Sequence, residues 1–263
     1  MSLAEVWRRM VPASVRGQLR PIQALFEKKH DAEFTFWKRR LKTEGTFDNA
    51  HFRQLMLAMA EESTDDFLRG KVVADFGCGP RGSLVWATPA SLRIGIDVLA
   101  DRYYDEFRDQ MLSHGMIYLT CTEHGIPLPS DFVDVMFTLN AIDHVDGFSE
   151  MCAEILRVLK PGGELIGSFN LDEPPTMCEP QQLDEEVVKE HLLTHLAVRS
   201  YRKVHRRHPK SVQSSTALTA RYAEFFDDTS LLERGRESVL WVRAVKSAEG
   251  AIAPSVGVPA ASR

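Results

Sequence analysis

The sequence has no long apolar run, no internal repeat and no marked excess of one charge. Hydrophobic residues make up 44% of the 263 residues and charged residues 26%, an ordinary composition for a globular protein. The apolar runs have the length of strands, so none is long enough to span a bilayer. The lack of a repeat of about 20 to 50 residues excludes solenoids and propellers. The length fits one large domain, or one domain with additions.

Cysteine is scarce, and the distribution of charge is balanced. The four cysteines, Cys78, Cys121, Cys152 and Cys178, form no C-x-x-C pair, so we expect neither a zinc ribbon nor a disulfide framework. Reduced thiols fit a cytoplasmic location, and residues 10–19 are too polar to be the core of a signal peptide. The 32 basic and 37 acidic residues give a net charge of −5, which argues against a protein that mainly coats nucleic acid.

The chain divides into a helical beginning and an alternating central part. Apolar spacing predicts that residues 1–69 form an N-terminal helical extension that can serve as a lid. Its second helix contains apolar positions from Phe52 to Phe67 and would be capped by Asp48 or Asn49. From residue 71 to 170 short apolar runs alternate with amphipathic ones, which predicts a parallel sheet covered by helices.

The last third of the chain predicts a helix and two further strands. The helix would cover residues 183–195, and the strands residues 197–205 and 238–245. The main domain would therefore extend over residues 70–247, with a substrate-side insertion near residues 207–236. Residues 248–263 are rich in Ala, Gly, Pro and Ser and are expected to form a disordered tail.

A glycine-rich segment follows the first strand of the alternating part. In V-A-D-F-G-C-G-P-R-G, residues 73–82, Gly77, Gly79 and Gly82 satisfy G-x-G-x-x-G and predict a strand–turn–helix unit with a ligand close to the backbone. Asp97 ends the second strand, 18 residues after Gly79, where its carboxylate can accept hydrogen bonds from a ribose. Nicotinamide dehydrogenases share both features, so these residues alone do not identify the cofactor.

Two further features favour another class of protein. Asp75 precedes the glycines, and a carboxylate there would repel a pyrophosphate but attract a cationic ligand. The chain also contains I-P-L-P-S-D-F-V-D-V-M-F at residues 126–137 and L-R-V-L-K-P-G-G-E-L at residues 156–165. With D-F-G-C-G as the first motif and G-I-D as the acid of the second strand, residues 71–170 resemble the class I S-adenosylmethionine-dependent methyltransferases.

The resemblance implies a fold, a cofactor and a set of cofactor contacts. The fold would be α/β, a doubly wound, seven-stranded, mostly parallel sheet of the Rossmann-like methyltransferase type with an N-terminal helical addition. The cofactor would be S-adenosyl-L-methionine, with its methionine part at the glycine turn, its ribose on Asp97 and its adenine beside Val98 or Leu99. The cofactor-binding residues would be Asp75, Gly77, Cys78, Gly79, Asp97, Val98, Thr122, Glu123 and Asn140.

One position departs from the family pattern. The loop after the third strand usually offers an aspartate to adenine, whereas this chain has Thr122 followed by Glu123. We expect these two residues to take that role together. Asn140, at the end of the fourth strand, would face the methionine part.

The acceptor would be methylated by direct displacement, so the protein mainly aligns the reactants. An alcohol also needs a general base, and His144 or Asp143, just after the fourth strand, are the candidates for it. His144 can instead be structural, and Asp143 with His144 can hold magnesium, but we expect no metal. The histidines His191 and His195, four residues apart, are best explained as helix-surface residues.

The acceptor itself is predicted only by class. We expect O-methylation of a small molecule, such as a sugar or another hydroxylated biosynthetic metabolite. The basic run at residues 199–210 is either a solvated strand face or a patch for an anionic or carrier-linked acceptor, with nucleic acid and a membrane-bound N-terminal helix less favoured. Alternatives are N- or C-methylation on the same fold, an NAD-dependent oxidoreductase, and a non-catalytic cofactor-binding partner.

Overall fold

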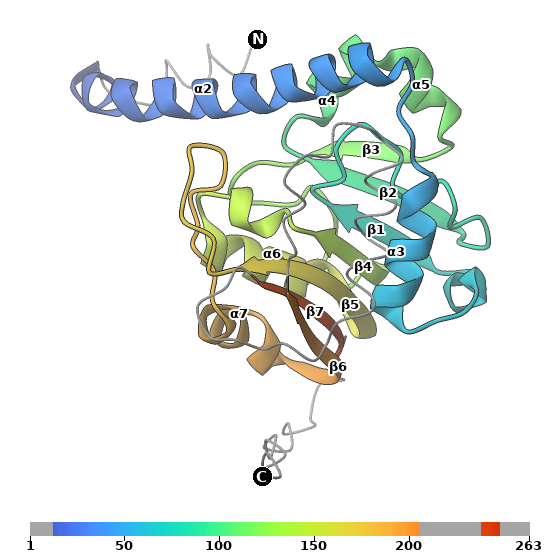
Figure 1. Cartoon of the computed structure of the whole chain (residues 1–263). Helices are drawn as coiled ribbons and strands as arrows, with labels where there is room; N and C mark the ends of the chain where they lie inside the picture. The colour runs from blue at the N-terminus through green and yellow to red at the C-terminus, as the bar shows by residue number, and fades with distance from the viewer. Residues whose placement is uncertain (1–12, 206–237, 248–263) are drawn as a thin grey trace.

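A seven-stranded sheet forms the centre of the computed structural model, which describes residues 13–205 and 238–247. The strand order is β3-β2-β1-β4-β5-β7-β6, with β7 antiparallel to both of its neighbours and the other pairings parallel (Figure 1). The predicted fold class is therefore confirmed. The strands are β1 (Val72–Phe76), β2 (Leu92–Asp97), β3 (Ile117–Thr120), β4 (Val133–Leu139), β5 (Leu159–Leu171), β6 (Leu196–His205) and β7 (Ser238–Lys246).

Helices cover both faces and one end of the sheet. No helix among the described residues is both long and apolar enough to cross a membrane. The α-helices are α2 (Ala13–Glu44), α3 (Ala50–Ala60), α4 (Ala100–Glu106), α5 (Arg108–Ser113), α6 (Phe148–Val158) and α7 (Glu185–His191). Single 3₁₀ turns are η1 (Asp65–Leu68), η2 (Ile142–His144) and η3 (Leu193–His195).

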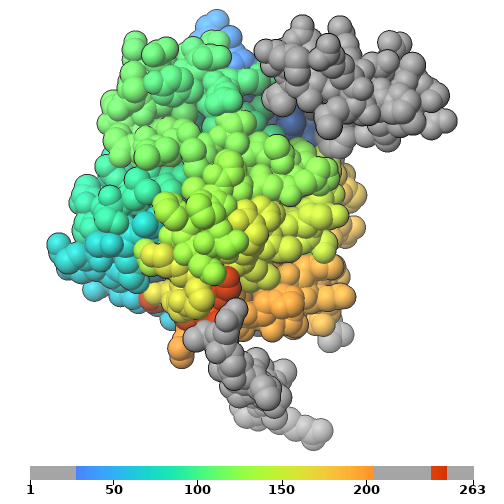
Figure 2. Space-filling view, turned by 180° about the vertical axis from the view of Figure 1, so that it is seen from behind, coloured from blue at the N-terminus to red at the C-terminus, as the bar shows by residue number. Residues whose placement is uncertain are grey.

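The core is divided by the sheet into two layers. In β1, Val73 faces the side covered by α3, whereas Ala74 and Phe76 face the side covered by α6 and α7, as the two-residue period of a strand requires. Figure 2 shows this second side, where yellow-green residues meet the orange residues of the α7 region. Both faces of β1 are buried, which explains why its sequence is an almost continuous apolar run.

The long helix α2 lies across one end of the sheet, above α4 and β3 (Figure 1). Its second half packs on α4 through aromatic rings, with Phe34 stacked on Tyr103 at 6.1 Å between ring centroids. Trp37 meets Phe47 edge-on at 5.9 Å. This packing fixes the C-terminal half of α2 beside the sheet end at which β2 and β4 stop.

The glycine turn after β1 is not followed by a helix, so that part of the strand–turn–helix prediction is wrong. Residues 77–91 form turns and bends that lead directly into β2. Pro80 and Pro89, with the glycines of the turn, disfavour a helix in so short a segment. The face that such a helix would cover is occupied by α3, whose Leu55 and Met59 belong to the same apolar cluster as Val73.

Other predicted boundaries differ in detail. The second predicted helix ends at Ala60, and Phe67 lies in η1. Asp48 supplies the side-chain acceptor at its start, because Oδ1 lies 3.0 Å from the amide nitrogen of Ala50, whereas the side chain of Asn49 makes no such bond. The helix predicted at residues 183–195 is α7 followed by η3, and the two late strands are confirmed as β6 and β7. The predicted insertion (207–236) and tail (248–263) lie outside the described residues.

Candidate functional site

Two adjoining cavities lie between α2 and the sheet. The larger measures about 400 Å³ and is bounded by α2 and by the residues that follow β1, β2, β3 and β4. The smaller measures about 250 Å³ and extends from α2 to α3, β5 and β7. The residues that line both cavities are Phe36, Trp37, Gly77, Leu139 and Asn140.

Gly77 occupies the tightest position between the cavities. Its φ of +72° is unfavourable for any other residue, and a Cβ atom there would lie 2.1 Å from the Cβ of Ala141. Gly79 lies under the ring of Trp37 and lines neither cavity, and its contact with a cofactor stays a prediction. A ligand in either cavity can therefore come close to the backbone at Gly77.

Asp97 places a buried carboxylate in the larger cavity. Its Oδ1 accepts a hydrogen bond from the amide of Leu99 at 2.9 Å, and its Oδ2 one from the amide of Gly79 at 3.0 Å. Burial raises the pKa of Asp97 to about 6, and the negative charge of Glu33 acts in the same direction. Each carboxylate oxygen has a second lone pair, so Asp97 can also accept hydrogen bonds from a ribose diol.

Glu123 lines the larger cavity and also ties it to α2. Its Oε1 lies 3.1 Å from Nε2 of His30 and 3.6 Å from Nζ of Lys29, and its Oε2 accepts the amide of Asp146 at 3.1 Å. Burial alone would raise the pKa of Glu123, but the hydrogen bond from His30 and the charge of Lys29 hold it below its ordinary value. Thr122 and Val98 line the same cavity, and a contact of these residues with adenine stays a prediction.

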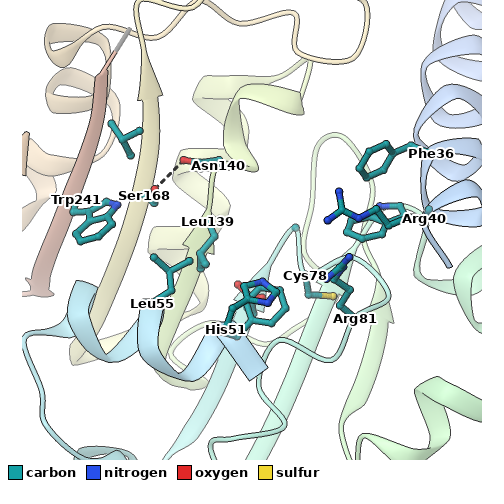
Figure 3. A pocket seen from close by; sticks show the side chains of 15 residues that line it. Phe36, Arg40, His51, Leu55, Cys78, Arg81, Leu139, Asn140, Ser168 and Trp241 are labelled. Carbon is teal, nitrogen blue, oxygen red and sulfur yellow. Dashed lines mark hydrogen bonds between the residues drawn. The ribbon is translucent and has the colours of Figure 1, made fainter. Parts of the chain in front are cut away.

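Asp75 and Cys78 face the smaller cavity (Figure 3). Asp75 is buried, one of its oxygens accepts the Ser83 hydroxyl, and burial raises its pKa to about 7. Burial also raises the pKa of the Cys78 thiol well above its ordinary value, so it stays neutral. The structure thus places these two predicted cofactor residues around the glycine turn, lining the smaller cavity, whereas Asp97 lines the larger one.

Asn140 stands where the two cavities meet. Its side-chain Oδ1 accepts the hydroxyl of Ser168 at 2.8 Å, and its backbone nitrogen donates to the carbonyl of Ser168 at 2.8 Å (Figure 3). These two bonds fix the end of β4 against β5. Asn140 thereby lines both cavities from a fixed position.

The smaller cavity has an aromatic wall. Phe36 and Trp37 come from α2, Phe52 from α3 and Trp241 from β7, so four rings from three elements converge. The imidazole of His51 lies beside them (Figure 3). Burial and the charge of Arg81 lower its pKa to about 4, which keeps it neutral at pH 7.

The predicted bases Asp143 and His144 follow β4. Nδ1 of His144 lies 3.7 Å from Glu33, and Nε2 lies 3.5 Å from Glu179. Burial would lower the pKa of His144, but Glu33 with Asp143 and Glu179 raises it to about 9. His144 lines the larger cavity, whereas Asp143 lies beneath it, with its pKa raised by burial to about 6. In this arrangement His144 is a cation at neutral pH, and a role as general base stays a prediction.

The predicted basic patch is largely neutralised where the structure describes it. Nε of Arg202 lies 3.1 Å from Glu61, and Nζ of Lys203 pairs with Glu185. The remainder of the run, residues 206–210, lies outside the described residues. The described part of the run therefore has the ion pairs of a solvated strand face.

The strand order, the glycine turn after β1 and the acid that ends β2 define a Rossmann-like α/β domain. Residues 74–167 match the family model described as "Methyltransferase domain". The resemblance to class I S-adenosylmethionine-dependent methyltransferases is thereby confirmed for this part of the chain, and S-adenosylmethionine is the cofactor of this class. The larger cavity fits that cofactor, since it combines a buried ribose-type acid with the close approach at Gly77.

One curated relative, also a methyltransferase, is similar to part of this chain. The chain is 31% identical over 94 residues to a malonyl-[acyl-carrier protein] O-methyltransferase of Enterobacter lignolyticus (strain SCF1), a match of 35% of this chain and 36% of the relative. The match thus spans about a third of the curated relative.

Two solved structures share the fold. A SAM-dependent methyltransferase of Thermotoga maritima has 14% identity and a TM-score of 0.52, over 84% of this chain and 99% of that one. The [4+2]-cyclase SpnF has 19% identity and a TM-score of 0.51, over 74% of this chain and 81% of that one. At such low identity these structures bear on the fold alone.

Proposed function

We propose that this chain is an S-adenosylmethionine-dependent methyltransferase that methylates an oxygen atom of a hydroxylated small molecule. The observation that carries the proposal is the junction of two cavities at Gly77 and Asn140, one with a ribose-type acid and one with aromatic walls. Displacement at a methyl group requires the donor, the methyl and the acceptor to lie in line with water excluded. Two adjoining cavities supply that arrangement.

The larger cavity would hold the cofactor. Asp97 would accept the ribose hydroxyls, Val98 would pack beside adenine, and Gly77 with Asn140 would face the methionine part. When bound, the cofactor supplies an electrophilic methyl group on a sulfonium. The carboxylate of Asp75, close to the turn, adds negative potential that favours a cationic ligand.

The smaller cavity would hold the acceptor. Its volume of about 250 Å³ suits one ring-sized group and is small for an ordered stretch of nucleic acid. The rings of Phe36, Phe52 and Trp241 can pack on the apolar faces of such a group, while Asn140 meets its polar edge. These features support a sugar or another small hydroxylated metabolite as the acceptor.

A carrier-linked acceptor is the second candidate. It is favoured by the name of the curated relative, a malonyl-[acyl-carrier protein] O-methyltransferase, whose match covers 35% of this chain. A carboxylate acceptor would need no base, because it carries no proton to remove.

The test is calorimetric titration with S-adenosylmethionine, S-adenosylhomocysteine and NAD, with Asp97→Ala as the matched variant. We expect micromolar binding of both sulfur compounds, at least tenfold weaker in Asp97→Ala, and no binding of NAD. Transfer of labelled methyl to a panel of small hydroxylated and carrier-linked acceptors then separates the two acceptor classes. Binding of NAD alone would contradict the proposal and favour an oxidoreductase, and cofactor binding without any methylated acceptor would favour a non-catalytic partner.

A further inference from the structure

Three potential metal ligands gather at the rim of the larger cavity. Asp143 and His144 come from η2, and Glu179 comes from the connection between β5 and α7. One ligand atom from each of these side chains lies within 4.8 Å of the others. Glu33 of α2 approaches the same imidazole from the opposite side, with 3.7 Å between its Oε2 and Nδ1 of His144.

A second observation points to a missing partner in this cluster. Asp143 is only 4% exposed, and within the described residues its Oδ1 has no hydrogen-bond partner. A buried carboxylate oxygen without a partner is costly, and native structures rarely leave one unexplained. Among the described residues, Nζ of Lys29 forms ion pairs with Asp146 at 3.4 Å and Glu123 at 3.6 Å, and not with Asp143.

We propose that Asp143, His144 and Glu179 bind a divalent metal ion of the Mn²⁺ or Mg²⁺ type. Carboxylates suit such hard cations, and an imidazole ligand favours Mn²⁺ over Mg²⁺. Ligand atoms around an ion of this size lie about 3 to 4.2 Å apart, so small rotations of the side chains complete the set.

Glu33 is a positioning residue for this site. Nε2 of His144 faces Glu179 at 3.5 Å, and Nδ1 faces Glu33. A metal would displace the Nε2 proton of the cationic imidazole. The proton that remains on Nδ1 and points at Glu33 would then hold the ring in the tautomer whose Nε2 lone pair binds the metal. Carboxylates behind ligating histidines have this role in other metal sites.

The catalytic use of the ion rests on the proposed function, whereas binding of the ion does not. None of the three ligands lines the smaller cavity, so the ion would meet oxygens of an acceptor that extends past the junction at Gly77 and Asn140 toward the rim of the larger cavity. Three protein ligands leave coordination positions for such oxygens, and a divalent ion lowers the pKa of a hydroxyl that it binds. Acceptors with two adjacent oxygen atoms, such as a vicinal diol or a hydroxy acid, would then be preferred. His144 would act as a ligand and not as the general base.

The test is titration of the full chain with MnCl₂ in the absence of cofactor, followed by calorimetry and by the electron paramagnetic resonance signal of free Mn²⁺. We expect one ion per chain with a micromolar Kd. Glu179→Gln and Asp143→Asn should weaken binding at least tenfold, and Glu33→Gln severalfold. Glu186→Gln, an exposed carboxylate on α7, is the matched control and should bind as the wild type does.

Each outcome separates this inference from the proposed function. Absence of Mn²⁺ binding, or binding that survives both Glu179→Gln and Asp143→Asn, overturns the metal site. If Asp143→Asn fails to fold by circular dichroism, Glu179→Gln decides, because Glu179 lies in a partly exposed connection. A chain that binds Mn²⁺ but no sulfur cofactor would retain the site and lose the methyltransferase assignment.

Discussion

At the scale of single residues, Asp97 connects burial to ligand binding. It is 7% exposed, yet two backbone amides donate to its carboxylate and stabilise the charged form. Burial outweighs them, so the pKa of Asp97 lies near 6 and not near 4. A residue that must accept hydrogen bonds from a ribose is thereby sensitive to pH just below neutrality.

We predict that the affinity for S-adenosylhomocysteine falls about tenfold between pH 7 and pH 5. The sign follows from the raised pKa of Asp97, because below pH 6 the carboxyl gains a proton and loses acceptor capacity. Calorimetric titration between pH 5 and pH 8 measures the effect. The control is Asp97→Asn, which should bind S-adenosylhomocysteine weakly, with less than a threefold change in affinity over this pH range. This variant retains the other acids that titrate in the range, such as Asp143. A flat wild-type profile would refute the role of Asp97.

Residues in the motifs could be assigned from the sequence, whereas residues of the aromatic wall could not. Gly77, Asp97 and Asn140 line the same larger cavity, because a strand end and a tight turn determine their positions locally, and their contacts with a cofactor stay predictions. Phe52 and Trp241 reach the smaller cavity only through the packing of α3 and β7. No short-range pattern distinguishes such rings from core residues.

At the scale of elements, the position of α2 is the feature of the structure that the sequence predicts least well. Its helical character follows from the spacing of its apolar residues, but its position depends on pairs far apart in the chain. Arg81, 4% exposed, donates to both carboxylate oxygens of Glu44 at 2.7 Å, and Lys29 lies 3.6 Å from Glu123. Such pairings cannot be inferred from a single sequence. The absent helix after β1 was more predictable, given Pro80 and Pro89.

We predict that Glu44→Gln lowers the free energy of unfolding by about 2 to 4 kcal/mol, because it leaves the buried guanidinium of Arg81 without its counter-charge. Urea denaturation followed by circular dichroism measures this loss. Glu106→Gln removes the partner of Lys38 in a more exposed pair that joins α2 to α4, and should cost less than about 1 kcal/mol. Equal losses in the two variants would show that the Glu44–Arg81 pair does not hold α2 in place.

At the scale of the whole molecule, the larger cavity lies between two parts of the chain and is lined by both. One wall is α2, through residues from Lys29 to Trp37, and the other is the end of the sheet. A ligand in this cavity touches both parts, so its binding energy adds to the contacts that hold α2 on the sheet. The stability of α2 and the affinity for the cofactor are therefore coupled.

We predict that saturating S-adenosylhomocysteine slows amide hydrogen exchange in residues 28–44 as well as in the turn at residues 77–79. At a free concentration of 100 times Kd it should add about 2.7 kcal/mol to the free energy of unfolding. Exchange measured by mass spectrometry under conditions of local opening resolves the two segments. Helix α7 lines neither cavity and is the internal reference, with little change expected. Protection confined to the turn, with α2 unchanged, would mean that α2 is packed on the sheet for stability alone and takes no part in holding the cofactor.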